Sequence, residues 1–306
     1  MADRATAQER LFVLRKTISR LEGRAPMLVA EEQPEKGKGS AICMSSRRIS
    51  LGIAEVDAAL EGGIPLDGMT EVRTTMMRDA GAGSGLVLAL AALIQKQTGA
   101  SALLWISDRV SNGETGPPYP VGLAQYGVQV EHFLHAAPRT VEDALWLAET
   151  AAASGALSAT ILEIRGNPSS FGLSESRRLS LRAKAARRPI LLLRQAGEEE
   201  ASSAVFRFHA APAPASERVL HTGARLGGSI GFPVFRLTLE KSRNPAPLSL
   251  LLEWNSHDRQ FSLARPEPSR LSAHAATHPG ARFPVSVDGP DRAPAVGRLL
   301  AFDRAS

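Results

Sequence analysis

A glycine-rich stretch in the first third of the chain has the composition of a phosphate-binding loop. Gly81, Gly83 and Gly85 follow MTEVRTT, which is typical of a strand, and precede a helix-like segment. In this setting, backbone N–H groups at the start of the helix can bind phosphate. A nucleotide-hydrolysing loop also needs Lys and then Ser or Thr directly after its last glycine, for the outer phosphates and for magnesium. Leu86 and Val87 stand there instead. The pattern therefore predicts no ATP hydrolysis and no required cofactor, and leaves weak nucleotide binding open.

A run of basic residues between Ser174 and Pro189 is the second candidate binding feature. Its spacing predicts a helix, and the cations of such a helix could contact an anion or a DNA backbone. Equally, they could form a solvated outer face, with Leu179 and Leu181 partly buried. No aromatic residue is interleaved with them, so base stacking is not indicated. The basic residues are Arg177, Arg178, Arg182, Lys184, Arg187 and Arg188.

Other catalytic and metal-binding chemistry finds no support in the residues. The seven histidines show no ligand spacing joined to carboxylates, and neither Ser84 nor Ser170 lies in a nucleophile-elbow pattern. Cys43 is the single cysteine, which excludes an intramolecular disulfide and any multi-cysteine zinc site. We therefore expect no metal ion and no catalytic residue.

Length and composition predict a folded cytoplasmic protein. The chain has 306 residues, of which 43% are hydrophobic, enough for one sizeable core or two modest ones. Its net charge of +5 is a mild excess that suits an anionic partner without requiring one. No apolar run approaches the ~20 residues of a membrane span, and the charged start of the chain does not resemble a signal peptide. A single cysteine suits a reducing compartment.

The middle of the chain alternates strand-like and helix-like segments. This alternation is typical of an α/β fold with a mostly parallel sheet covered on both faces. The predicted strands are Met69–Thr75, Ala102–Ser107, Thr160–Ile164 and Ile190–Arg194, and the predicted helices are Gly85–Gln97, Val141–Ser154 and Ser174–Ala186. Four later strands, separated by turns, predict antiparallel pairing at one sheet edge. They are Ala204–His209, Val234–Lys241, Leu248–Trp254 and Gln260–Leu263. Trp105, Trp146 and Trp254 fall on apolar faces and are predicted to be core residues.

Four regions follow from these patterns. Residues 1–23 predict an amphipathic helix, residues 24–46 a linker, residues 47–264 the core domain, and residues 265–306 a Pro-rich flexible tail. The helix carries its apolar stripe on Leu11, Leu14, Ile18 and Leu21, and the tail ends in an apolar segment with Leu299, Leu300 and Phe302. The stripe must be buried on its own domain, on another subunit or on another protein. The tail segment predicts either a short recognition motif or a fragment that folds back.

Two segments of the core resemble the bacterial recombinase RecA. ISLGIAEVDAALEGGIPLDGMTEV, from Ile49 to Val72, is similar to the start of the RecA core. YGVQVEHFLHAAPRTVEDALWLAETAAASGALSATILEI, from Tyr126 to Ile164, is similar to its middle. The opening helix LRKTISRLEG, the degenerate phosphate loop and the Pro-rich tail more closely resemble ImuA, a family of RecA-like proteins of bacterial SOS mutagenesis. The resemblance reaches from Ile49 to about Ala264 and implies a RecA-like fold.

This resemblance also assigns roles to several polar residues. Glu163 falls where RecA has its magnesium-associated Asp, so with the three glycines it would form a vestigial cofactor site. Gln195 falls where RecA has a Gln that senses nucleotide and DNA. Lys241 and Arg243 fall where RecA presents two lysines to nucleotide across the subunit interface.

The departures from RecA argue against strand exchange. In RecA, a strand delivers a Glu that positions the attacking water. The nearest acid here is Asp108, which is better explained as a strand-end or helix-cap residue. The two DNA-binding loops are shortened to Arg165–Gly172 and Ala196–Ser203. The second loop contains Glu198–Glu200, which would repel a phosphate backbone.

As a whole, the resemblance implies a non-enzymatic adaptor of the SOS response. It would act with an ImuB-type Y-family-like protein and an error-prone DnaE-type polymerase in translesion synthesis and damage-induced mutagenesis. RecA, a second copy of the chain and, weakly, DNA are further expected partners, whereas a membrane is not. Two alternatives stay open: a DNA-dependent ATPase of RecA type, in which Arg78 or Lys96 supplies the missing cation, and a SulA-like inhibitor of cell division.

Overall fold

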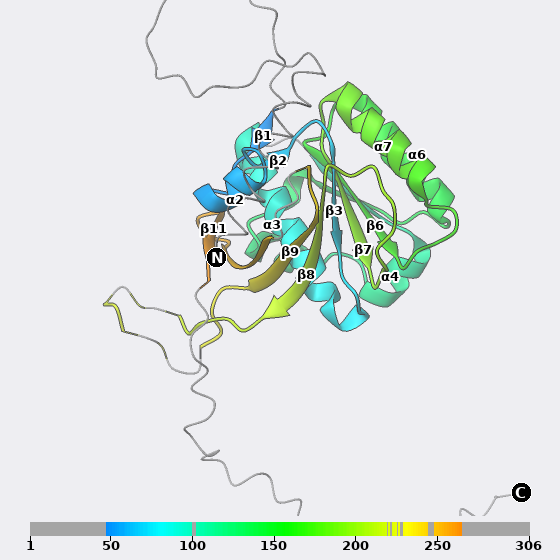
Figure 1. Cartoon of the computed structure of the whole chain (residues 1–306). Helices are drawn as coiled ribbons and strands as arrows, with labels where there is room; N and C mark the ends of the chain where they lie inside the picture. Colours follow the sequence, from blue (N-terminus) through cyan, green and yellow to red (C-terminus); the bar gives the residue numbers. More distant parts are fainter. Residues whose placement is uncertain are drawn as a thin grey trace, which may run out of the picture. The chain divides into compact units, whose positions relative to one another are not determined.

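Parallel strands that alternate with helices form the centre of the structure, with antiparallel strands at one side (Figure 1). The computed structural model describes residues 47–99, 102–218, 220, 222–224, 226, 229–243 and 248–264, which belong to the compact unit Ser46–Ser306. The predicted N-terminal helix, the linker with Cys43, and the tail lie outside the described residues. The calls on Leu11, Leu14, Ile18, Leu21, Leu299, Leu300 and Phe302 therefore remain predictions.

The described elements follow each other in a βαβ-rich order. The strands are β1 (Arg48–Ile49), β2 (Ile64–Pro65), β3 (Met69–Arg73), β4 (Leu103–Ser107), β5 (Phe133–Ala136), β6 (Ala159–Arg165), β7 (Ile190–Gln195), β8 (Phe206–Ala213), β9 (Val234–Lys241), β10 (Leu248–Asn255) and β11 (Gln260–Leu263). The helices are α2 (Ala54–Ala59), α3 (Ala80–Thr98), α4 (Arg109–Thr115), α5 (Pro120–Gln125), α6 (Val141–Ser154) and α7 (Leu173–Ala186), with 3-10 turns η1 (Met77–Asp79) and η2 (Val130–His132).

One nine-stranded sheet carries the fold, in the order β11-β10-β9-β8-β3-β7-β6-β4-β5. The strands from β8 to β5 pair in parallel, whereas β9, β10 and β11 pair antiparallel. This confirms the predicted α/β class with a mostly parallel sheet and antiparallel strands at one edge. A separate two-stranded sheet joins β1 and β2.

Three details of the sequence prediction were wrong. Strand β8, predicted as antiparallel over Ala204–His209, runs from Phe206 to Ala213 and pairs in parallel with β3 and antiparallel with β9. Helix α3 begins at Ala80, five residues before the predicted Gly85. Strand β5 was not predicted, because its four residues are too few to show a period and none of them is fully buried.

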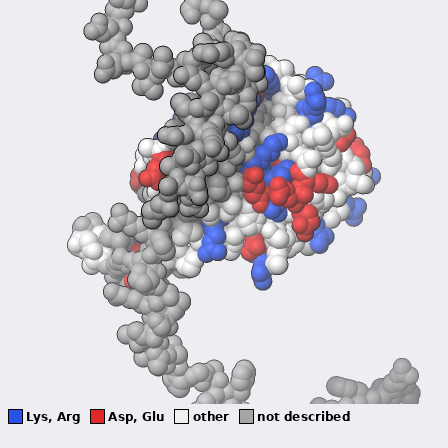
Figure 2. Space-filling view, viewed as in Figure 1, with Lys and Arg blue, Asp and Glu red and all other residues white. Residues whose placement is uncertain are grey.

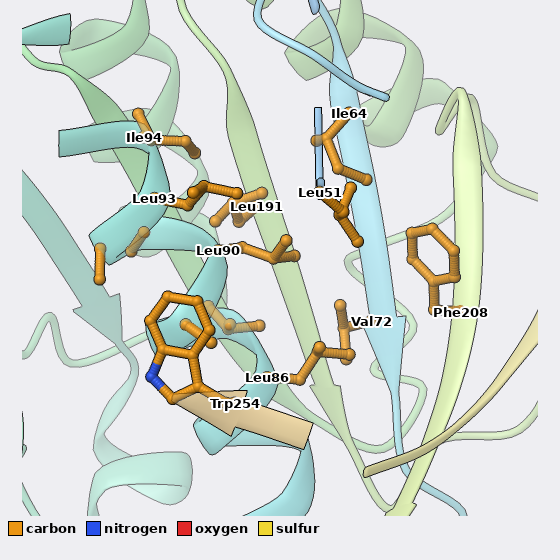
Figure 3. Packing of buried hydrophobic residues seen from close by; sticks show 14 of the residues in the cluster. Leu51, Ile64, Val72, Leu86, Leu90, Leu93, Ile94, Leu191, Phe208 and Trp254 are labelled. Carbon is orange, nitrogen blue, oxygen red and sulfur yellow. The ribbon is translucent and has the colours of Figure 1, made fainter. Parts of the chain in front are cut away.

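Two apolar layers cover the two faces of the sheet. On one face, α3 packs its buried side chains against the sheet and against the antiparallel strands, as Figure 3 shows for Leu86, Leu90 and Trp254. On the other face, α6 and α7 pack against the parallel strands. By length and hydropathy, the segment Met77–Thr98 could also cross a membrane, but most of it is buried in the core, which fits a soluble protein.

The three tryptophans do not share one environment. Trp105 and Trp254 are buried, as predicted, with 3% and 0% of their surface exposed. Trp254 donates its indole N–H to the Tyr126 carbonyl at 3.2 Å and packs on Phe261 with ring centres 4.7 Å apart. The prediction for Trp146 was wrong, since 66% of this side chain is exposed on the outer face of α6.

Substitution of Trp254 and of Trp146 should therefore change the stability of the protein by very different amounts. Trp254→Ala should lower the free energy of unfolding by about 3–5 kcal/mol, because it opens a large cavity in the core. Trp146→Ala is the matched control and should change it by less than ~0.5 kcal/mol. Urea unfolding followed by circular dichroism measures both. Equal losses in the two variants would contradict this assignment of core and surface.

Candidate functional site at the carboxyl edge of the sheet

The three glycines of the phosphate-loop pattern lie inside helix α3, and none of them has a positive φ. A Cβ added at Gly83 would lie 2.7 Å from Thr74 Cγ2, and one added at Gly85 would lie 2.5 Å from the Tyr126 hydroxyl. Gly81 has nothing within 4 Å of such a Cβ. Gly83 and Gly85 therefore allow α3 to pack closely on its neighbours, and protein side chains fill the space beside them.

Neither residue after these glycines can face a phosphate at the carboxyl edge. Leu86 and Val87, which occupy the positions of the phosphate Lys and the magnesium hydroxyl, are buried in the core. Lys96 donates to the Asp258 carbonyl at 2.9 Å and lies fifteen residues beyond Gly81, or about 22 Å along the helix axis. Lys96 therefore cannot substitute for the missing cation. Arg78 is exposed in η1, directly before the helix.

Glu163 lies at the centre of a buried hydrogen-bond network near the carboxyl end of β6. Its carboxylate accepts from the Trp105 indole N–H at 3.0 Å and from the Gln195 amide at 3.2 Å. The same Gln195 nitrogen donates to the Ser84 hydroxyl at 2.9 Å, and Thr74 Oγ1 donates to the Gln195 amide oxygen at 3.1 Å. The network joins β4, β6, β7, α3 and Thr74, the residue directly after β3. The structure thus brings Glu163 and Gln195 together beside the first turns of α3, and both side chains bond to protein groups.

A cavity of about 290 Å³ opens beside this network, between α3, β4 and the segment that ends in α5. Ser84, Trp105, Tyr119, Leu123, Tyr126 and Glu163 contribute to its lining. Burial raises the pKa of the Tyr126 hydroxyl above its usual range. The cavity therefore combines apolar walls with one carboxylate and no lining cation among the described residues. This chemistry disfavours a phosphate group.

Asp108, the nearest acid to the expected water-positioning Glu, caps helix α4. Its carboxylate accepts from the backbone N–H groups of Val110 at 3.1 Å and Ser111 at 3.3 Å, and from the Ser111 hydroxyl at 2.5 Å. The interpretation of Asp108 as a helix cap is confirmed. Across the described part of the chain, no group of three His, Cys, Asp or Glu is placed to hold a metal ion.

A second polar cluster, which the sequence analysis missed, lies on the opposite face of β3. Glu71 is buried and pairs with Arg194 of β7 at 3.3 Å and with Arg207 of β8 at 3.1 Å. Arg73 makes a two-pronged ion pair with Glu240 of β9, at 2.6 and 2.5 Å, and this partner raises the pKa of its guanidinium. The sequence could have indicated this cluster, because side chains alternate along a strand and Glu71 and Arg73 therefore lie on one face of β3.

This ion cluster binds the acidic loop that contains Glu198–Glu200. Glu199 pairs with Arg207 at 3.4 Å, and Glu200 pairs with Arg194 at 3.6 Å. Arg207 also donates to the Glu200 carbonyl, and Arg73 donates to the Gly197 carbonyl at 3.0 Å. Figure 2 shows acidic and basic side chains intermingled in one patch on the face it displays. Glu199 and Glu200 are therefore both paired with arginines of the sheet.

The other shortened loop joins the same structure. The Asn167 side chain donates to the Glu198 carbonyl at 3.2 Å and accepts from the Glu198 N–H at 2.7 Å. Lys241 points inward and donates to the Ser202 carbonyl. Burial, together with the nearby Arg207, lowers the pKa of the Lys241 ammonium. Arg243 is exposed. Lys241 and Arg243, which the resemblance placed together, therefore have different surroundings.

The basic residues of α7 fall into two groups. Arg178 is exposed but pairs with Glu149 of α6, and the partly buried Arg188 donates to the Gly155 carbonyl at 2.9 Å. The other four cations are exposed on the outer side of the helix or just after it: Arg177, Arg182, Lys184 and Arg187. Leu179 is buried, but the expectation that Leu181 is partly buried was wrong, since 58% of it is exposed.

A pair of glycine substitutions tests the packing of α3. Gly83→Ala should destabilise the protein by about 1–3 kcal/mol, because its Cβ would overlap Thr74 and crowd Leu193. Gly81→Ala should be neutral or stabilise it by up to ~1 kcal/mol, since the site is open and Ala favours helix. Thermal and urea unfolding measure the difference. The opposite order would show that the glycines do not serve helix packing.

Comparison with known proteins gave no match to this chain, either among protein-family models or among curated protein sequences.

Proposed function

We propose that this protein is a RecA-like accessory protein of the SOS mutasome that works without ATP hydrolysis. One observation carries the proposal. The place of a phosphate loop is taken by a packed helix, in which Gly83 and Gly85 contact side chains and Leu86 and Val87 lie in the core. Charge stabilisation of a transferring phosphoryl group needs Lys, magnesium and a carboxylate together. Only Glu163 stands in its expected place, and it is bonded to Trp105 and Gln195.

The arrangement of the sheet supports the RecA-like part of the proposal. A RecA-like core is consistent with parallel strands covered by helices on both faces and continued by antiparallel strands at one side. Glu163 and Gln195 lie on neighbouring strands, β6 and β7, and meet at the carboxyl edge.

The acidic loop supports an adaptor over a recombinase. A DNA-binding loop must expose cations or N–H groups to phosphates. Here Glu199 and Glu200 pair with arginines of the sheet, and the loop is bonded to Asn167 and Lys241. With this loop held down, contacts with other proteins become the main function of the core.

The partners come from the resemblance to ImuA. An ImuB-type protein and an error-prone DnaE-type polymerase would be recruited in translesion synthesis and damage-induced mutagenesis, in the cytoplasm. The predicted N-terminal helix, residues 1–23, and the tail, residues 265–306, would supply docking segments, and a tethered segment raises the local concentration of its partner. RecA and a second copy of this chain are further candidate partners.

Measurement of ATP turnover separates the adaptor from a DNA-dependent ATPase. The full-length protein should show no turnover above the blank, with or without single-stranded DNA, because Leu86 and Val87 stand in the positions of the phosphate Lys and the magnesium hydroxyl. Glu163→Gln should leave that baseline unchanged. Turnover that DNA stimulates and Glu163→Gln abolishes would contradict the proposal and favour the ATPase.

Co-elution with an ImuB-type protein tests the adaptor role directly. The full-length chain should form a complex that survives size-exclusion chromatography, and a chain cut after Ala264 should form less of it. Unchanged co-elution after the cut would contradict only the role of the tail. Absence of any complex would contradict the adaptor function as a whole.

A further inference from the structure

Helices α6 and α7 present an outer surface on which apolar and charged side chains are exposed to solvent. The two helices lie side by side on one face of the sheet (Figure 1). Two large apolar side chains project from them into solvent, Trp146 with 66% and Leu181 with 58% of their surface exposed. Arg177, Arg182 and Lys184 are exposed on α7, and none of them has an ion pair within the described residues. We call these five residues the α6–α7 face.

One ion pair fixes the relative placement of the two apolar residues. Arg178 of α7 donates to Glu149 of α6 at 2.8 Å. Trp146 lies one helical turn before Glu149, and Leu181 lies one turn after Arg178, so both neighbour this pair on the helix surface. The two helices connect parallel strands and therefore run in the same direction. The two apolar anchors are consequently about 9 Å apart along the helix direction.

The charges of the face are separated along and between the helices. Glu142 and Asp143 lie in the first turn of α6, four and three residues before Trp146, and are exposed. Helix α7 carries one acid, Glu175, in its first turn, and its cations follow from Arg177 to Lys184. The face is therefore apolar in the middle, acidic at the start of α6 and basic along α7.

We propose that the α6–α7 face binds an acidic amphipathic segment of a partner protein. The apolar side of such a segment would cover Trp146 and Leu181, and its carboxylates would pair with Arg177, Arg182 and Lys184. Exposed Trp and Arg are the residues that most often dominate binding energy at protein interfaces. Opposite charges across the rim set orientation and speed association.

A nucleic acid fits the same face less well. Phosphate binding makes no use of the exposed Leu181, which stands among the cations of α7. A strand stacked on Trp146 would also meet the exposed acids Glu142 and Asp143 one turn away. An acidic amphipathic protein segment would instead bury Trp146 and Leu181, and it would end before it reached Glu142 and Asp143.

This inference goes beyond the proposed function, because it concerns the core rather than the N-terminal helix or the tail. It holds equally if the protein proves to act outside the SOS response or to hydrolyse ATP, so the two proposals fail separately.

Tryptophan fluorescence of the full-length protein gives a direct readout. Trp105 and Trp254 are buried, so a change in solvent-exposed emission reports on Trp146. The probe is a synthetic peptide of about four helical turns, with Leu and Phe at i, i+3, i+4 and i+7 and Glu elsewhere. Its control is a scrambled peptide of the same composition. The amphipathic peptide should shift the emission to shorter wavelength and bind at least tenfold more tightly than the scrambled one, with affinity that falls as salt rises.

Surface variants identify the binding residues. The double substitution Arg177→Glu and Arg182→Glu should weaken peptide binding about tenfold or more, and so should Leu181→Ala combined with Trp146→Phe, followed by a labelled peptide. The matched control is Arg236→Glu, the same charge reversal at an exposed cation of β9, which should leave binding within about twofold. Circular dichroism confirms that each variant is folded.

Three results would overturn the inference. The first is the absence of any emission shift at millimolar peptide. The second is equal binding of the amphipathic and scrambled peptides, which would reduce the face to a non-specific cationic patch. The third is tighter binding of single-stranded oligothymidylate than of the peptide through the same residues, which would make the face a nucleic-acid surface.

Discussion

Close packing of helix α3 against the sheet is the constraint on which the rest of the structure depends. Gly83 lies so near Thr74 and Gln195 that a single methyl group would overlap the first of them. Because interiors are packed at the density of organic crystals, such a contact leaves no room for a ligand. Once the first turns of α3 are held this closely, Leu86 and Val87 are directed into the core, and Gln195 bonds both Ser84 and Glu163. The close packing of α3 on the sheet therefore determines which side chains line the carboxyl edge.

The opposite face of β3 is stabilised by charge where the acidic loop covers it. Glu71, Arg194 and Arg207 are removed from water, and removal of ions from water is costly unless each is paired. The acidic loop provides further partners through Glu199, Glu200 and several backbone carbonyls. The loop and the buried ions therefore stabilise each other, and the loop is unavailable as a binding arm.

These two features direct the functional surfaces outward. The carboxyl edge retains a cavity with apolar walls and one carboxylate, and the acidic loop is pinned by the sheet. The outer side of α6 and α7 is exposed, with Trp146 on α6 and Leu181 on α7 beside the unpaired cations of α7. The proposed adaptor, which binds through outer surfaces, is consistent with a core in which side chains fill the space beside Gly83 and Gly85.

Periodicity in the sequence determined much of the fold by itself. The bounds of α6, β9 and β11 were predicted to the residue, and the glycine-rich stretch was correctly judged to lack the Lys and hydroxyl of a nucleotide-hydrolysing loop. The apolar spacing of each segment identifies the side that avoids water, and this is a local property of the chain.

Only the tertiary structure decided what each of those sides meets. It set the parallel pairing of β8 with β3, because strand direction depends on the neighbour and not on the strand's own period. It placed Trp146 in solvent and Glu71 in a buried ion cluster, since either residue suits its element in both environments. It also started α3 at Ala80 rather than Gly85, because close contact with β3 and β7 outweighs the low helix propensity of glycine. A local pattern cannot report a contact between segments far apart in the chain, and the function of this protein depends on such contacts.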